Sequence, residues 1–256
     1  MSKPQGYENT YDKAGSLRAP CLILLHGATG TRKQWLPQLD ALSDQYRVLA
    51  PDLPGHGECA HERFTLDGAV SAVERLIRER APLGDALVVG QSLGGYVATA
   101  LAARAPQCVR GLMLAGSSIN FTGAMGTLAR MNGSLYGAFP KRWLAGLNAR
   151  ELRKRLPPAL AEAQIEAGFF FGAAGDVFRA LSGQDFHALL RGFPGPVLIA
   201  NGSADAPNRR AEAAHAAAAQ HAQVRVIANA GHVCNLEAPD AFNAALRDFA
   251  GQVFAT

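Results

Sequence analysis

The sequence contains no hydrophobic run long enough to cross a membrane. Its longest apolar stretches, such as 21–25 and 86–89, have the length of β-strands, whereas a membrane helix needs about 20 apolar residues. The N-terminal segment also lacks an apolar core after Lys3, so a secretory signal is not indicated. We therefore expect a cytoplasmic protein that does not associate with membranes.

Cysteine is scarce, and so is net charge. The four cysteines, Cys21, Cys59, Cys108 and Cys234, stand far apart and form no C-x-x-C pair, so we assign neither a metal site nor a redox site. The net charge of +4 over 256 residues is a weak field, and we expect no nucleic-acid partner. Six basic residues but only one acid lie within 135–156. We interpret this segment as a solvated helix face, with attraction of an acidic substrate or carrier as the alternative.

What the sequence does contain is the pattern of an α/β protein. Hydrophobic residues make up 48% of the chain and charged residues 18%, as in a globular domain. Short apolar runs alternate with stretches at helical spacing, which predicts a mostly parallel sheet flanked by helices. The expected strands are 21–25, 46–50, 86–89, 109–114, 196–200 and 224–228. Because these runs are nearly continuous in apolar residues, we expect them to be buried on both faces. The expected helices are 34–42, 66–80, 93–104, 209–220 and 238–249.

One long segment interrupts this alternation. No clear strand appears within 119–193, although about 70 residues is too long for a simple connection in a compact domain. The segment contains helical stretches at 144–156 and 159–167. We therefore predict a core domain formed by 1–118 and 194–256, with an inserted helical cap at 119–193.

The strongest chemical signal is the run GQSLGG at 90–95, which joins an expected strand to an expected helix. A G-x-S-x-G motif in that context is typical of a nucleophile elbow, a sharp turn that exposes the serine hydroxyl. Its glycines avoid clashes in the turn, and the following helix places a positive dipole near developing negative charge. We predict that Ser92 is a nucleophile; a serine that caps the helix is the alternative.

A serine nucleophile needs a base, and the base needs a carboxylate that orients it. His232 follows the last expected strand, and Asp205 follows the strand before it, so both can reach the sheet edge where Ser92 lies. The chain order Ser, Asp, His is that of the nucleophile-elbow class. A loop histidine and a turn-forming aspartate are the alternatives. The segment 115–120, which follows the last strand before the insertion, has no carboxylate that could take this role.

The run LLHGATG at 24–30 ends the first clear strand in a glycine-flanked turn. A tetrahedral intermediate requires two preorganised N–H donors. We predict that the backbone amides of Ala28 and Leu93 supply them. His26 is expected to hold the loop, and the turn-rich run at 51–57 to shape the floor of the site.

Together these motifs resemble the α/β-hydrolase superfamily, in its branch of capped, cofactor-free serine hydrolases. The resemblance covers nearly the whole chain and rests on LHG at 25–27, DLPGHG at 52–57, GQSLGG at 90–95, NGSAD at 201–205 and AGH at 230–232. The C-terminal run 231–242 is similar to that of carboxylesterases, enol-lactonases and related perhydrolases.

The resemblance implies an α/β-hydrolase fold with a core sheet of about eight strands, a cap, no cofactor, and catalysis by Ser92, Asp205 and His232. The family usually opens with an antiparallel hairpin. Here 7–16 is a poor strand pattern, so we expect that hairpin to be short or missing.

We therefore expect a hydrolase of carboxylic esters or lactones that forms an acyl-enzyme, with a small apolar ester as substrate. Cleavage of carbon–carbon bonds, thioester hydrolysis, perhydrolysis and lyase chemistry on the same triad stay open, as does a non-catalytic ligand receptor. The residues predicted to bind substrate are Phe121, Met125, Phe169, Phe170 and Val233. Packing of the cap phenylalanines against the core is the alternative. The oligomeric state is open between monomer and dimer.

Overall fold

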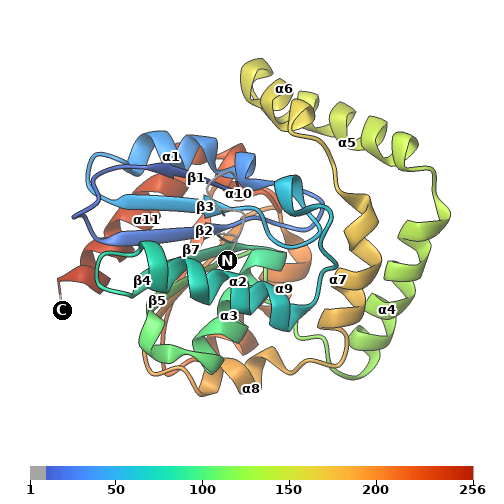
Figure 1. Cartoon of the computed structure of the whole chain (residues 1–256). Helices are drawn as coiled ribbons and strands as arrows, with labels where there is room; N and C mark the ends of the chain where they lie inside the picture. Colours follow the sequence, from blue (N-terminus) through green and yellow to red (C-terminus); the bar gives the residue numbers. More distant parts are fainter. Residues whose placement is uncertain (1–9, 256) are drawn as a thin grey trace, which may run out of the picture.

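The computed structural model describes residues 10–255; residues 1–9, which belong to the predicted core domain, lie outside this range. The described chain forms one seven-stranded sheet with the strand order β1-β3-β2-β4-β5-β6-β7 (Figure 1). The strands are β1 (Tyr11–Ala14), β2 (Cys21–Leu25), β3 (Arg47–Pro51), β4 (Ala86–Gln91), β5 (Val109–Ala115), β6 (Pro196–Gly202) and β7 (His221–Ile227). All neighbouring pairs are parallel except β1 with β3, so the prediction of a mostly parallel α/β sheet is confirmed.

Helices cover both faces of the sheet (Figure 1). On one face lie α1 (Leu36–Leu42) and α11 (Pro239–Phe254), and on the other lie α2 (Leu66–Arg80) and α3 (Leu93–Arg104). Successive residues of a strand point to opposite faces, so Ile23 packs with α2 and α3 while Leu24 packs with α1 and α11. Two hydrophobic layers therefore hold the sheet from both sides.

Two strands depart from the sequence-based expectation. Although 7–16 is a poor strand pattern, β1 is present there as four residues that pair antiparallel with β3; in the described chain the expected short or missing hairpin is this one short strand. The last strand, β7, begins three residues earlier than predicted and is exposed along most of its length, with Val224 46% exposed. Burial on both faces is therefore wrong for β7, because this strand lies at the sheet edge, where apolar residues alone do not indicate a covering layer.

The inserted segment is helical. Between β5 and β6 the chain forms α4 (Gly123–Ala138), α5 (Lys141–Arg155), α6 (Pro158–Glu166), α7 (Ala174–Leu181) and α8 (Phe186–Arg191). Figure 1 shows α4 to α7 beside the carboxyl ends of the strands, with α4 against α7 and α5 beside α6. In contrast, α8 packs against α3 and α9 (Ala206–Ala218). Within residues 10–255, no helix is both long and apolar enough to span a membrane.

Candidate active site

Ser92 occupies a strained turn between β4 and α3. Its backbone φ is +50°, and its side chain makes no capping hydrogen bond to α3. A positive φ is unfavourable for a residue with a side chain and persists only where the surrounding structure enforces it. This geometry is that of the strand-to-helix turn expected from the sequence, and the helix-capping alternative does not describe the Ser92 side chain.

Glycine is needed on either side of Ser92, because atoms of neighbouring segments come very close to these positions. A Cβ at Gly90 would lie 2.3 Å from the carbonyl carbon of Gly94, and one at Gly94 would lie 2.0 Å from the carbonyl oxygen of Leu25. A Cβ at Gly95 would lie 2.1 Å from Ser117 Oγ. Helix α3 thus starts in contact with β2, β4 and the end of β5, so no larger side chain fits at these positions.

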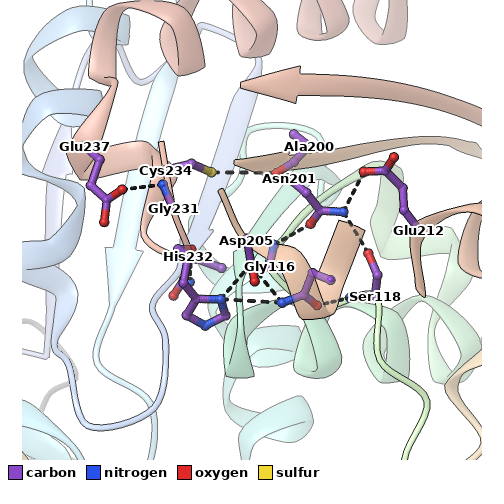
Figure 2. A network of polar contacts seen from close by, with 12 residues as sticks. Gly116, Ser118, Ala200, Asn201, Asp205, Glu212, Gly231, His232, Cys234 and Glu237 are labelled. Carbon is purple, nitrogen blue, oxygen red and sulfur yellow. Dashed lines mark hydrogen bonds and ion pairs between the residues drawn. The ribbon is translucent and has the colours of Figure 1, made fainter. Parts of the chain in front are cut away.

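His232 and Asp205 form a hydrogen-bonded pair at the carboxyl ends of β6 and β7 (Figure 2). The distance from His232 Nδ1 to Asp205 Oδ2 is 2.8 Å, which leaves Nε2 free to face a substrate. Ser92 and His232 line the same cavity, and within residues 10–255 no hydrogen bond joins them. Such bonds are often long before substrate binds, so the arrangement suits a nucleophile, a base and an orienting acid.

The charge on Asp205 is stabilised by two hydrogen bonds. Burial acts to raise the pKa of Asp205, but the hydrogen bonds from His232 and Asn208 outweigh it and hold the pKa below its ordinary value. Asn208 Nδ2 donates to Asp205 Oδ2 at 2.8 Å, and its Oδ1 accepts from Ser118 N at 2.8 Å. Asn208 therefore fixes the carboxylate to the loop after β5, a role that the sequence analysis did not identify.

A second buried amide joins the ends of β5 and β6 (Figure 2). Asn201 Oδ1 accepts from Gly116 N at 3.0 Å, while its Nδ2 donates to Ser118 Oγ and Glu212 Oε2. A Cβ at Gly116 would lie 3.0 Å from the His232 ring. The segment 115–120, which has no carboxylate, instead contributes Gly116. Because glycine has no Cβ, it leaves space for the imidazole of His232.

Buried neutral amides connect the loop at 24–30 to the loop that carries His232. Gly27 N donates to Gln34 Oε1 at 3.0 Å, and Gln34 Nε2 donates to Gln91 Oε1 and Asn235 Oδ1. Gln91 Nε2 in turn donates to the carbonyl of His232 at 2.9 Å. Among the described residues, no acceptor binds the amides of Ala28 and Leu93, which leaves both donors available to a ligand.

Two buried histidines, His26 and His56, form hydrogen bonds with the loop at 24–30. His26 Nδ1 donates to Gly27 O at 2.8 Å and its Nε2 accepts from Leu53 N at 3.0 Å. His56 Nδ1 donates to Pro54 O, and its Nε2 accepts from Thr29 N at 3.3 Å. Burial lowers the pKa of His26 to about 4 and that of His56 to about 3. Both rings are therefore neutral at pH 7, and each connects the loop at 24–30 to the run at 51–57 by hydrogen bonds.

The cavity above Ser92 has a volume of about 220 Å³. Of the five predicted substrate-binding residues, Phe169 and Val233 line it. Phe121 instead packs on Tyr96 and Phe186, with ring centroids 5.1 Å and 6.4 Å away. Met125 is exposed, and Phe170 faces a neighbouring pocket. The structure therefore does not bring Phe121, Met125 and Phe170 into the lining of the cavity that contains Ser92.

One wall of the cavity is charged and joins α5 to the His232 loop. Arg155 pairs with Glu151 Oε1 at 2.6 Å and with Glu237 Oε1 at 3.3 Å. Glu237 Oε2 also accepts a hydrogen bond from Gly231 N, directly before His232 (Figure 2). Of the six basic residues at 135–156, Arg155 is the one that lines the cavity, while Arg153 pairs with Glu162 away from it.

The cysteines take no part in this site. All four are free thiols and buried, and burial raises the pKa of Cys21, Cys59 and Cys234 to about 12. Thiols of this kind are protonated and unreactive. Over the described range, no three residues of the types His, Cys, Asp and Glu gather as a metal site would require.

Comparison with known proteins places this geometry in a family context. Residues 22–245 match the model described as "Alpha/beta hydrolase family". The chain is 30% identical over 250 residues to the pimeloyl-[acyl-carrier protein] methyl ester esterase of Neisseria meningitidis, an alignment that covers 89% of this chain and 92% of that one. It is 31% identical to the dihydrolipoyllysine-residue acetyltransferase component of the acetoin cleaving system of Pseudomonas putida, covering 87% of this chain but only 61% of that relative.

Solved structures give the same result. A thermophilic esterase from Thermogutta terrifontis superposes with a TM-score of 0.81 at 25% identity, over 95% of this chain and 93% of that one. The enol-lactonase of Burkholderia xenovorans superposes with a TM-score of 0.78 at 23% identity, over 94% of this chain and 95% of that one, and supports the fold.

Proposed function

This chain belongs to the alpha/beta hydrolase family, and from that premise we propose that it is a serine hydrolase that cleaves carboxylic esters or lactones. The observation that carries the proposal is the position of Ser92, held at φ +50° on the wall of a cavity that His232 also lines. The bond from His232 to Asp205 supports the same assignment. Each of the three side chains then has one role in acyl transfer.

In the first half of the reaction, Ser92 Oγ forms a bond to the acyl carbon while His232 Nε2 takes the hydroxyl proton. The negative charge moves to the carbonyl oxygen, which accepts hydrogen bonds from the amides of Ala28 and Leu93. The bond to the alcohol oxygen then breaks, and that oxygen leaves with the proton from His232. Asp205 stabilises the imidazolium throughout, because its carboxylate stays ionised beside Nδ1.

In the second half, water attacks the acyl-enzyme and His232 takes one of its protons. The tetrahedral intermediate again uses the amides of Ala28 and Leu93 and collapses to a carboxylic acid, while the proton returns to Ser92 Oγ. Loss of one hydrogen-bond donor of this kind lowers kcat about 10²–10³-fold. No cofactor and no metal enter either half of this mechanism.

The test is hydrolysis of a panel of activated esters, lactones and thioesters by the wild-type protein and by S92A. We expect S92A to lose several orders of magnitude in kcat with every substrate that the wild type cleaves. A fluorescent phosphonate should label the wild type on Ser92 and leave S92A unlabelled. Wild-type turnover by S92A would refute the assignment of the nucleophile.

The same panel separates the other functions that the triad permits. Faster turnover of thioesters, peracid formation or carbon–carbon cleavage would move the assignment to another reaction of the same acyl-enzyme chemistry. Thermal stabilisation by ligands, without phosphonate labelling and without turnover, would identify a receptor that uses the pocket for binding alone.

A further inference from the structure

A second pocket adjoins the cavity of Ser92, and one side chain separates the two. The second pocket has a volume of about 290 Å³ and is lined by Phe64, Phe170 and Gly172 among others. Phe169 lines this pocket and also the cavity of about 220 Å³ that contains Ser92. Among residues 10–255, no other residue lines both of these pockets, so we take Phe169 as the partition between them.

The backbone around Phe169 is fixed, which leaves its side chain as the part that can move. Gly168 turns the chain sharply at φ +85°, and Phe170 N donates to Thr29 O at 2.8 Å. Thr29 lies next to Ala28 in the loop at 24–30, so a shift of the whole segment would disturb the proposed amide donor. The Phe169 ring is only partly buried, so its rotation would be the movement that joins the two spaces without that disturbance.

The second pocket has both apolar and charged side chains in its lining. Phe64, Phe170 and Ala173 are apolar, and Glu62, Arg63, Lys141 and Asp176 supply charge. Arg63 is paired with Asp176 at 3.2 Å. The pocket therefore holds apolar walls together with ionic groups that stay hydrated, an arrangement that matches an extended amphipathic chain better than a compact group.

We propose that the second pocket is the distal subsite of the Ser92 cavity and that Phe169 is the specificity-determining residue between them. The substrate class is then an ester with an extended chain that passes Phe169 and lies between Phe64 and Phe170. This inference rests on the proposed ester hydrolysis and adds to it the shape of the substrate. Each methylene buried beyond Phe169 should raise kcat/KM about fourfold until the pocket is filled.

The test compares kcat/KM for p-nitrophenyl esters of increasing acyl length and, separately, for benzoate esters of alcohols of increasing length. G172L fills the second pocket, because a Cβ at Gly172 would meet only the flexible end of Lys141, at 3.3 Å. G146L is the matched control on α5, since a Cβ there has no neighbour within 4 Å. F169A removes the partition, and F169W enlarges it.

In at least one series, we expect wild-type kcat/KM to keep rising with chain length. G172L and F169W should lower the ratio of long-chain to short-chain kcat/KM about tenfold or more, F169A should raise it, and G146L should leave it unchanged. A ratio that G172L and F169W do not alter in either series would overturn the inference while ester hydrolysis stands. No hydrolysis of any ester, with no phosphonate labelling, would instead refute the proposed function itself.

Discussion

The close approach of Gly116 to His232 allows a test of how the proposed base is held. Replacing Gly116 by alanine adds a Cβ that lies 3.0 Å from Cε1 and Nδ1 of the His232 ring. Carbon atoms at ordinary contact lie about 3.5–4.0 Å apart, so the ring must move by about 0.5–1 Å. A misplacement of about 1 Å in an active site can cost about 10²-fold in rate. We expect G116A to lower kcat about 10- to 100-fold.

The backbone at Gly116 complicates this test, because its φ of +60° is unfavourable for alanine. G84A is the matched control, since Gly84 also has a positive φ, +74°, but a Cβ there has no neighbour within 4 Å. The left-handed conformation costs each variant about 1–2 kcal/mol, or about 2–8 °C in Tm for a domain of this size. Both variants should lose stability, and only G116A should lose activity. Equal kcat values for the two variants with an ester substrate would refute the reasoning.

Three further outcomes are expected. R155Q should lower kcat/KM by up to about fivefold, because Arg155 pairs with Glu237 beside the His232 loop. The kcat/KM of R155Q should also be less sensitive to salt. R153Q is the control, and equal effects of the two substitutions would contradict this role. N208A should lower kcat about tenfold with little change in KM, since Asp205 loses a hydrogen bond; a change confined to KM would contradict it. Burial lowers the pKa of His215 to about 4, so the unfolded chain binds a proton at a higher pH than the folded chain, and stability decreases as pH falls from 6.5 to 4. In urea unfolding, H215L should lose less stability than the wild type between pH 7.5 and pH 5, while His26 and His56 keep their own dependence; an equal loss would contradict this role.

The sequence was most informative where structure depends on short local patterns. The turn at Ser92 follows from a strand, two glycines and a helix that are adjacent in the chain, and the strand positions follow from continuous apolar runs. The exposed edge strand β7 shows the limit of this reasoning. Its alternating valines have strand propensity, but whether a helix covers them depends on where α11 packs, which the strand itself does not encode.

The substrate pocket was harder to predict because it depends on how the insertion folds back. Phe169 and Phe170 are neighbours in sequence, yet Phe169 lines the Ser92 cavity and Phe170 does not. Their directions follow from the positive φ of Gly168 and the bond from Phe170 N to Thr29 O, a contact across 141 positions. Phe121 is aromatic like both but completes a core cluster with Tyr96. Composition alone cannot separate these environments.

Several of the buried groups that hold the site together are neutral. Gln34, Gln91 and Asn235 are neutral amides, and His26 and His56 are neutral because burial lowers their pKa values. Such groups orient backbone and dipoles without adding a full charge near Ser92. The charges of Arg155 and Glu237 lie on the wall formed by α5 and the His232 loop. With few full charges close to Ser92, the field at the developing oxyanion would come mainly from the Asp205–His232 pair and the amides of Ala28 and Leu93. The asparagine and glutamine network would then matter for rate by keeping these few groups aligned.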